Sequence, residues 1–289
     1  LDPDYKAPTL GEMVQQVHEN ETFHPTNPQT RANRRQRIGQ LHNHLRDLYQ
    51  DKDNKMLANK DILSDLQKIT TIVRQINKVV LVGGEAFLKK DLSDLIQKIG
   101  KIDNIGLFQI ITNGTIVPKD HRIFKTMADF NIFVEISGYG HHLTTSQKQN
   151  LHRFMALLDD YKVQYQYVKT LQWYDFGDFK HRGYRKDQWK EIYQKCCFVS
   201  NDLFDGQLHK CSRSAFAHRI HKVKDYKNDY VDVRHTNNPA ILKQKLERFF
   251  KNDRPMICQH CNGTSTSTIA AGVQLKKQLR QNDSATICK

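Results

Sequence analysis

From residue 60 onward, short apolar runs alternate with stretches that have helical spacing. The apolar runs occupy 78–82, 107–111, 132–136 and 163–168. Strands separated by helices are typical of βαβ units, whose strands lie parallel in one sheet. The sequence therefore predicts an α/β fold built on a parallel sheet.

The helical stretches are marked by apolar residues three or four positions apart. The longest predicted helix covers 62–76, and its apolar face is formed by Ile62, Leu66, Ile69, Val73 and Ile76. Further helices are expected at 92–99, 123–130 and 151–158, and an amphipathic helix is expected at 38–48.

Changes in composition divide the chain into three expected parts. Residues 1–59 are polar and proline-rich at the start, and they contain no candidate strand. Residues 60–185 form the α/β body. Residues 186–289 form an extension that contains all of the cysteines and has little periodic apolar sequence.

The charge balance suggests an anionic partner, but its distribution weakens that reading. Lys and Arg number 45 against 31 Asp and Glu, which gives a net charge of +14. The basic residues are spread along the chain, and the densest basic stretch has no interleaved aromatic residues for stacking on bases. A solvated basic surface is therefore favoured over a nucleic-acid site.

The apolar content excludes other classes of protein. Hydrophobic residues make up 38% of the chain, too many and too evenly spread for a disordered protein. No run approaches the roughly 18 apolar residues of a membrane span, and the first residues do not resemble a secretory signal. We expect a cytoplasmic protein without a membrane segment.

Three successive predicted strands are followed by glycine-rich or polar turns. The turns are Gly83–Gly84–Glu85, Thr112–Asn113–Gly114 and Ser137–Gly138–Tyr139–Gly140. Paired glycines let a ligand approach the backbone, and the Glu85 carboxylate can accept hydrogen bonds from an ammonium group. Each turn alone is compatible with ordinary turn chemistry. Because ligands bind at the carboxyl ends of parallel strands, the three together predict one small-molecule site.

The cysteines predict a metal site in the extension. They are Cys196, Cys197, Cys211, Cys258, Cys261 and Cys288. Cys258 and Cys261 have chelate spacing, and Cys211 with Cys196 or Cys197 supplies a second pair. Four thiolates suit Zn²⁺ or an iron–sulfur cluster, and the spacing does not choose between them. Free buried thiols are the alternative.

The segments at 79–88, 110–115 and 135–140 resemble the successive strand-end motifs of the radical S-adenosylmethionine (radical SAM) family. The segments at 171–177 and 205–215 resemble the SPASM/twitch-like extension of members with an auxiliary iron–sulfur cluster. The resemblance implies a partial (β/α)6 TIM-like barrel with an irregular, cysteine-rich C-terminal extension.

The same resemblance implies a chemistry. In the family, a 4Fe–4S cluster binds S-adenosylmethionine and cleaves it reductively to a 5′-deoxyadenosyl radical, which acts on the substrate. It places Gly83, Gly84 and Glu85 at the methionine end of the cofactor, with Thr112, Asn113 and Ser137 lining the same pocket. The cysteines would then hold an auxiliary 4Fe–4S cluster. The implied partners are a peptide or a carbohydrate-type small molecule as substrate, and flavodoxin or ferredoxin as reductant.

Two departures from the family pattern stand out. Ala86 replaces the usual proline, which is minor. The CxxxCxxC loop that holds the first cluster is missing, because no cysteine precedes Cys196. If the chain is a fragment, the edge of the sheet beside 78–82 should be unpaired. If it is a degenerate member, a strand from 1–59 should cover that edge. We expect the fragment, because the first strand is missing together with the cysteines.

Two further function classes remain open. One is a non-catalytic binding module that keeps the body and is stabilised by zinc or a cluster. The other, less favoured, is a basic protein that binds nucleic acid.

Overall fold

The computed structural model of the chain describes residues 57–140, 143–170, 172–196, 200–217, 219–220, 222–264 and 268–270. The predicted helix at 38–48, Cys197 and Cys288 lie outside these ranges.

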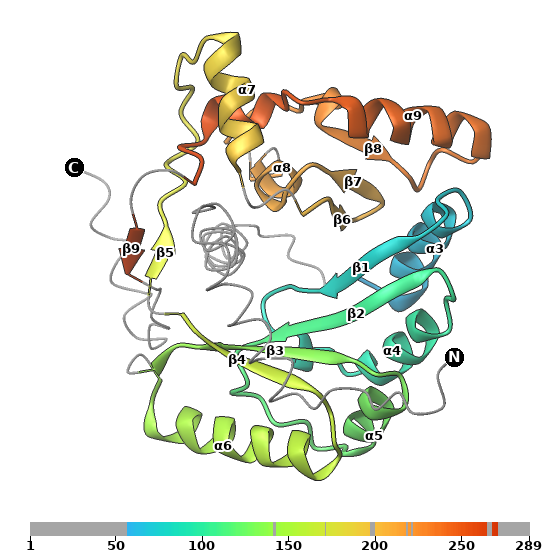
Figure 1. Cartoon of the computed structure of the whole chain (residues 1–289), viewed down its shortest axis with the longest axis vertical. Coiled ribbons are helices and arrows are strands. Elements are labelled where there is room, and N and C mark those ends of the chain that lie inside the picture. Colours follow the sequence, from blue (N-terminus) through green and yellow to red (C-terminus); the bar gives the residue numbers. More distant parts are fainter. Residues whose placement is uncertain are drawn as a thin grey trace, which may run out of the picture.

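Four parallel strands form the sheet of the body in the order β1-β2-β3-β4 (Figure 1). They are β1 (Ile76–Leu81), β2 (Ile105–Thr112), β3 (Phe133–Gly138) and β4 (Tyr165–Lys169). The predicted α/β class and the adjacent parallel strands are confirmed. The described strands form an open sheet, so the expected six-stranded barrel is not confirmed.

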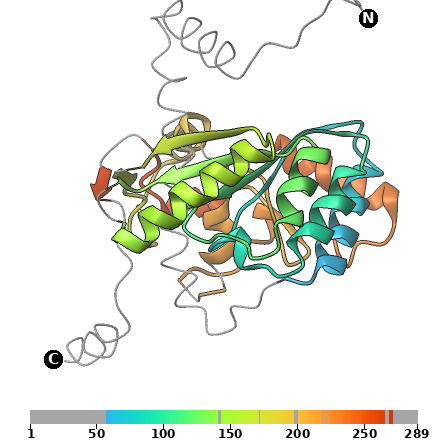
Figure 2. The ribbon, with the colours of Figure 1, turned by 90° about the horizontal axis from the view of Figure 1, so that it is seen from below.

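Helices cover one face of this sheet. They are α3 (Asn59–Thr70), α4 (Leu92–Gly100), α5 (Arg122–Asp129) and α6 (Thr145–Asp160), and the short helix η1 (Ala86–Leu88) follows β1. Figures 1 and 2 show α4, α5 and α6 together on one side of the strands. Phe108 and Ile110 of β2 and Val134 and Ile136 of β3 point toward these helices and form the core. Within the described ranges, no helix is long and apolar enough to cross a membrane.

Strand β1 is one edge of the sheet. No strand among the described residues pairs with its outer side. Residues 1–56, which include most of the segment expected to cover that edge in a degenerate member, lie outside the described ranges.

The predicted helix over 62–76 is wrong at its C-terminal end. Helix α3 stops at Thr70, and Ile76 begins β1. A run of β-branched residues, 69–73, disfavours continuation of the helix. The Asn104 side-chain amide then donates to the free carbonyls of Thr70 (2.8 Å) and Val73 (3.1 Å), which satisfies groups that the helix leaves unpaired.

The extension is more regular than its sequence suggests. It contains α7 (Lys186–Lys195), β6 (Asp202–Phe204), β7 (Gln207–His209), α8 (Ser212–Ala217), η3 (Lys227–Asp229), β8 (Tyr230–Asp232), α9 (Pro239–Lys251) and η4 (Met256–His260). Strands β6, β7 and β8 form an antiparallel sheet, and β5 (Gln172–Tyr174) pairs with β9 (Thr268–Ala270). The β6–β7 turn is Asp205–Gly206, with φ of 45° and 82°, as a two-residue hairpin requires.

Helix α3 joins the body to the extension. Leu63 and Leu66 belong to the core of the body, while Ile69 belongs to a second core formed with residues of the extension. The partners of Ile69 in that core are Leu208, Val231, Val233, Leu242, Leu246 and Phe249. One helix therefore contributes to both hydrophobic cores.

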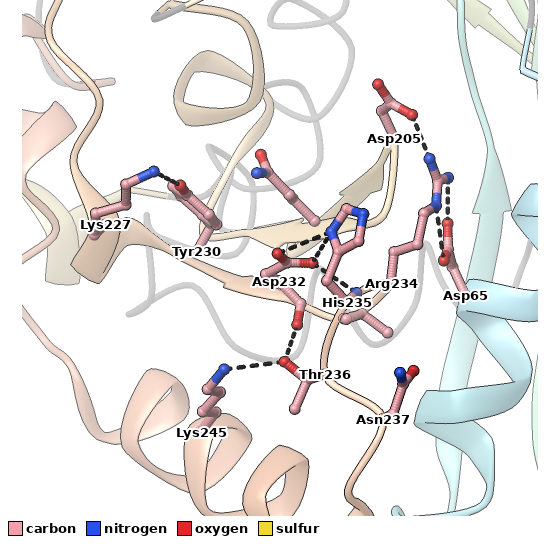
Figure 3. Close-up of polar contacts among 12 residues, drawn as sticks. Asp65, Asp205, Lys227, Tyr230, Asp232, Arg234, His235, Thr236, Asn237 and Lys245 are labelled. Carbon is pink, nitrogen blue, oxygen red and sulfur yellow. Dashed lines mark hydrogen bonds and ion pairs between the residues drawn. The ribbon is translucent and has the colours of Figure 1, made fainter.

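Polar contacts from the same helix reinforce the joint (Figure 3). The Arg234 guanidinium donates to both carboxylate oxygens of Asp65, at 2.7 and 3.3 Å, and to Asp205 at 2.7 Å. The Asp65 side chain is only 3% exposed, so its charge depends on Arg234 for compensation. The Lys68 ammonium group donates to the carbonyl of Arg234 and to Asn237.

We predict that Arg234→Met lowers the free energy of unfolding by about 3 kcal/mol, because it leaves the buried Asp65 carboxylate unpaired. Urea denaturation measures this loss. Adding Asp65→Leu to that variant should recover at least half of it, because no buried charge then remains. A double variant that is less stable than the single one would contradict this account.

Candidate functional site

The turn after β1 presents open backbone at the carboxyl edge of the sheet. Gly83 and Gly84 are exposed. Gly83 has a φ of +152°, a backbone conformation that residues other than glycine rarely adopt. A Cβ added at Gly83 would meet nothing within 4 Å. The backbone of this turn is therefore accessible to a small molecule.

Glu85 ties this turn to the end of the neighbouring strand. One carboxylate oxygen accepts from Thr112 Oγ1 at 2.6 Å and from the Phe87 N–H at 3.2 Å. The other accepts from the Asn113 N–H at 3.0 Å. The residue is half-buried, with its carboxyl group turned inward, and burial raises the pKa of that group above its usual value.

The side chains of Thr112 and Asn113 also form hydrogen bonds within the turn that follows β2. Thr112 Oγ1 accepts from the Gly114 N–H at 3.0 Å, and Asn113 Oδ1 accepts from the N–H and the hydroxyl of Thr115. Gly114 has a φ of +68°, and a Cβ there would lie 2.7 Å from Leu151. The turn after β2 is thus fixed by its own side chains and by Glu85.

Ser137 lies near the end of β3 and is only 4% exposed. Since Thr112 pairs with Ile136 in the sheet, Ser137 is next to the turn of β2 in register. The six residues predicted for the cofactor thus share one edge of the sheet. At this edge, Glu85, Thr112 and Asn113 form hydrogen bonds with other residues of the protein. Of the six predicted residues, Gly83 and Gly84 are the two that are exposed to solvent.

The raised pKa of Glu85 predicts a pH-dependent contribution to stability. The folded protein holds this proton more tightly than the unfolded chain, so the stability contributed by Glu85 falls as pH rises through the range that begins near 4.5. Glu85→Gln does not titrate. We therefore expect the stability of wild type relative to Glu85→Gln to decrease between pH 4.5 and 7.5 in urea denaturation. A constant difference across that range would contradict the assignment.

The described cysteines come from three segments of the extension. Cys196 follows α7, Cys211 precedes α8, Cys258 lies in η4, and Cys261 follows it directly. Cys211, Cys258 and Cys261 are free thiols, and Cys258 is buried. Cys197 lies outside the described ranges.

These four thiols lie in one neighbourhood. Burial raises the pKa of the Cys258 thiol well above its usual range, and negative charge on the other three raises it further. Burial also raises the pKa of Cys211, to which charges on Cys196, Asp202 and Cys261 add. Among the described residues, no three His, Cys, Asp or Glu side chains are arranged so that they could hold a metal ion. The cysteines are gathered, but they do not form a closed coordination site.

The segment that carries Cys258 is held by buried polar groups. The Asp229 carboxylate, from a residue 1% exposed, accepts from the N–H groups of Met256 and Ile257 at 2.7 Å each. Arg213 stacks 3.6 Å from the centre of the Phe179 ring and donates to the carbonyl of His260. These contacts keep the chelate-spaced pair in place.

Two of the thiols also accept hydrogen bonds from backbone. The Ser214 N–H donates to the sulfur of Cys211 and the Gly263 N–H donates to that of Cys261, both at 3.4 Å. Donors aimed at sulfur stabilise the thiolate form that binds metal ions.

Sequence reasoning missed a polar pair on the sheet. Gln109 of β2 donates to the Glu135 carboxylate of β3 at 2.8 Å. Each residue is flanked on both sides by core residues, such as Phe108 and Val134. The sequence signal for this pair is one polar residue inside each of two predicted strands.

No protein-family model matches the chain, and no curated protein matches it. Solved structures of a protein named anSMEcpe are similar to it. Native anSMEcpe with bound AdoMet and Cp18Cys peptide has 12% sequence identity and a TM-score of 0.45, over 68% of this chain and 74% of that one. Native anSMEcpe with bound AdoMet has 13% identity and a TM-score of 0.41, over 68% and 72%. Similarity at this level assigns neither a family nor an activity to this chain.

Proposed function

We propose that this chain carries the S-adenosylmethionine-binding part of a radical SAM-type enzyme, with a metal site in its extension. The carboxyl edge of β1 to β3 carries the proposal. There the open backbone of Gly83 lies beside the turn after β2, and Glu85 holds both turns in place. Small polar ligands bind at this edge of parallel sheets.

The residues fit the amino-acid end of the cofactor. Its ammonium and carboxylate groups would bond to exposed backbone at Gly83 and Gly84, which no side chain covers. Glu85, whose oxygens already accept bonds from its own chain, would position this turn rather than meet the ammonium group. Thr112, Asn113 and Ser137 would complete the wall next to it. When bound to a reduced 4Fe–4S cluster, the cofactor supplies radical chemistry.

The cluster that activates the cofactor requires ligands other than those of this chain. No cysteine precedes Cys196. Radical chemistry at this edge therefore requires a CxxxCxxC loop from outside these 289 residues. Without such a loop, the same edge would serve the second candidate, a non-catalytic binding module stabilised by metal.

In the extension, Cys211, Cys258 and Cys261 with Cys196 or Cys197 would hold an auxiliary 4Fe–4S cluster or a zinc ion. The shared neighbourhood of the thiols and the backbone donors to two sulfurs support this assignment. A peptide or a carbohydrate-type small molecule is the proposed substrate, and flavodoxin or ferredoxin is the proposed reductant. Both follow from the resemblance of the sequence motifs.

Cofactor binding provides the direct test. We expect Gly83→Ala to weaken S-adenosylmethionine binding about tenfold, because the added methyl group lies where the cofactor would approach the backbone. Gly183→Ala is the matched control. Gly183 also has a positive φ, of +66°, and an added Cβ there also meets nothing within 4 Å. An alanine costs about 1 kcal/mol of strain at the φ of Gly183 and about 1–3 kcal/mol at the φ of +152° of Gly83, so the folding of both variants is checked by circular dichroism.

Calorimetric titration of the wild type and both variants measures the affinities. Equal weakening by the two substitutions would show a general effect of strain. That result, or an absence of binding to the wild type, would contradict the proposed site.

Metal analysis tests the extension. Protein purified without oxygen should contain iron and sulfide if an auxiliary cluster is present, or zinc if the binding-module alternative holds. Substituting Cys258→Ser together with Cys261→Ser should remove the metal, because it breaks the chelate pair. Wild-type protein that contains neither metal, with all its thiols open to alkylation, would overturn the assignment.

A further inference from the structure

Gln109 and Glu135 lie on the face of the sheet that points away from α4, α5 and α6. Side chains alternate between the two faces of a strand, so Gln109 and Glu135 point away from the helices that cover their core neighbours. Leu107, on the same face of β2, is 39% exposed, and Ile111 and Phe133 are partly exposed. The pair is thus surrounded by apolar side chains that are not fully covered.

Gln109 is buried with an unused acceptor. The residue is 1% exposed and its Nε2 donates to Glu135. No described residue donates to its Oε1, which is also shielded from solvent. A buried acceptor without a partner is costly, so a bound water, an ion or a ligand group is expected to satisfy it. A ligand with an N–H or O–H donor would satisfy this oxygen.

Glu135 adds a negative charge that the described chain does not neutralise. No Lys, Arg or His in the described ranges forms an ion pair with it. A partly buried carboxylate without one favours a cationic ligand.

We propose that Gln109 and Glu135 bind a primary ammonium group of the substrate. An ammonium group has a positive charge and three donors, and it can bond at once to the Glu135 carboxylate and to Gln109 Oε1. The apolar side chains around the pair would contact the carbon chain that bears it. A lysine side chain and the amino terminus of a peptide both offer this chemistry.

The inference rests on the proposed function, since it names a substrate class for the same sheet. Gln109 precedes Thr112 by three residues and Glu135 precedes Ser137 by two. At about 3.3 Å per residue, the pair lies roughly 7–10 Å along the strands from the cofactor edge. The pair is therefore separate from the residues proposed for the cofactor.

Binding of n-butylammonium to the full chain tests the proposal without S-adenosylmethionine or iron. Ligand-observed NMR titration should give a millimolar dissociation constant that Glu135→Gln raises about tenfold, because the charge is lost while the shape is kept. Gln109→Leu should weaken binding by a smaller factor. The matched control is Glu191→Gln, which removes an exposed glutamate paired with Lys195 and should leave the affinity unchanged.

Uncharged n-butanol separates an ammonium site from a hydroxyl site. It should not compete with n-butylammonium. Binding of both probes with equal affinity, or equal effects of Glu135→Gln and Glu191→Gln, would overturn the proposal. Circular dichroism of each variant establishes that it folds.

S-adenosylmethionine itself carries an ammonium group, so its effect on the binding of n-butylammonium decides whether the pair is separate from the cofactor site. If saturating S-adenosylmethionine displaces n-butylammonium, the pair belongs to the cofactor site and the proposal fails. If the cofactor does not bind but n-butylammonium does, the proposed function fails alone. Nα-acetyl-lysine N-methylamide and leucine N-methylamide then distinguish a side-chain ammonium from an α-ammonium group.

Discussion

The Glu85 carboxylate joins the ends of two neighbouring strands, and the shape of the carboxyl edge depends on it. Turning a carboxyl group inward costs free energy, which hydrogen bonds from Thr112 and from the N–H groups of Phe87 and Asn113 offset. Because two of these donors belong to the next strand, the turns after β1 and β2 cannot move independently. Gly83 therefore stays exposed in a fixed position, as a preformed binding site requires.

The parallel sheet could be predicted from the sequence because strands of this kind form apolar runs. The end of the first helix could not. Ile72, Val73 and Ile76 continue the helical spacing of α3, but they pack against the second core, which is built mainly from the extension. Local periodicity does not reveal a partner that lies so far along the chain. Strands β6, β7 and β8 were missed because three residues are too few for a visible alternation.

The candidate site was predictable to the extent that its signals are local. Glycines after an apolar run identify the strand ends from sequence alone, and two cysteines with two residues between them identify the chelate pair. The direction in which a side chain points depends on residues distant in the sequence. The sequence therefore suggested that Glu85 faces a ligand, whereas it faces Thr112. Gln109 and Glu135 were missed because polar residues in strands usually face solvent, and their contact joins two strands.

Asp65 and Arg234 are separated by 169 residues, which has a consequence for how the chain folds. Closing so long a loop is entropically costly, and domains made first during synthesis tend to fold first. The body is therefore complete while the extension is still being made, with the Asp65 carboxylate hydrated and Ile69 uncovered at the end of α3. On a half-made chain, this helix end is an uncovered apolar surface to which a chaperone can bind.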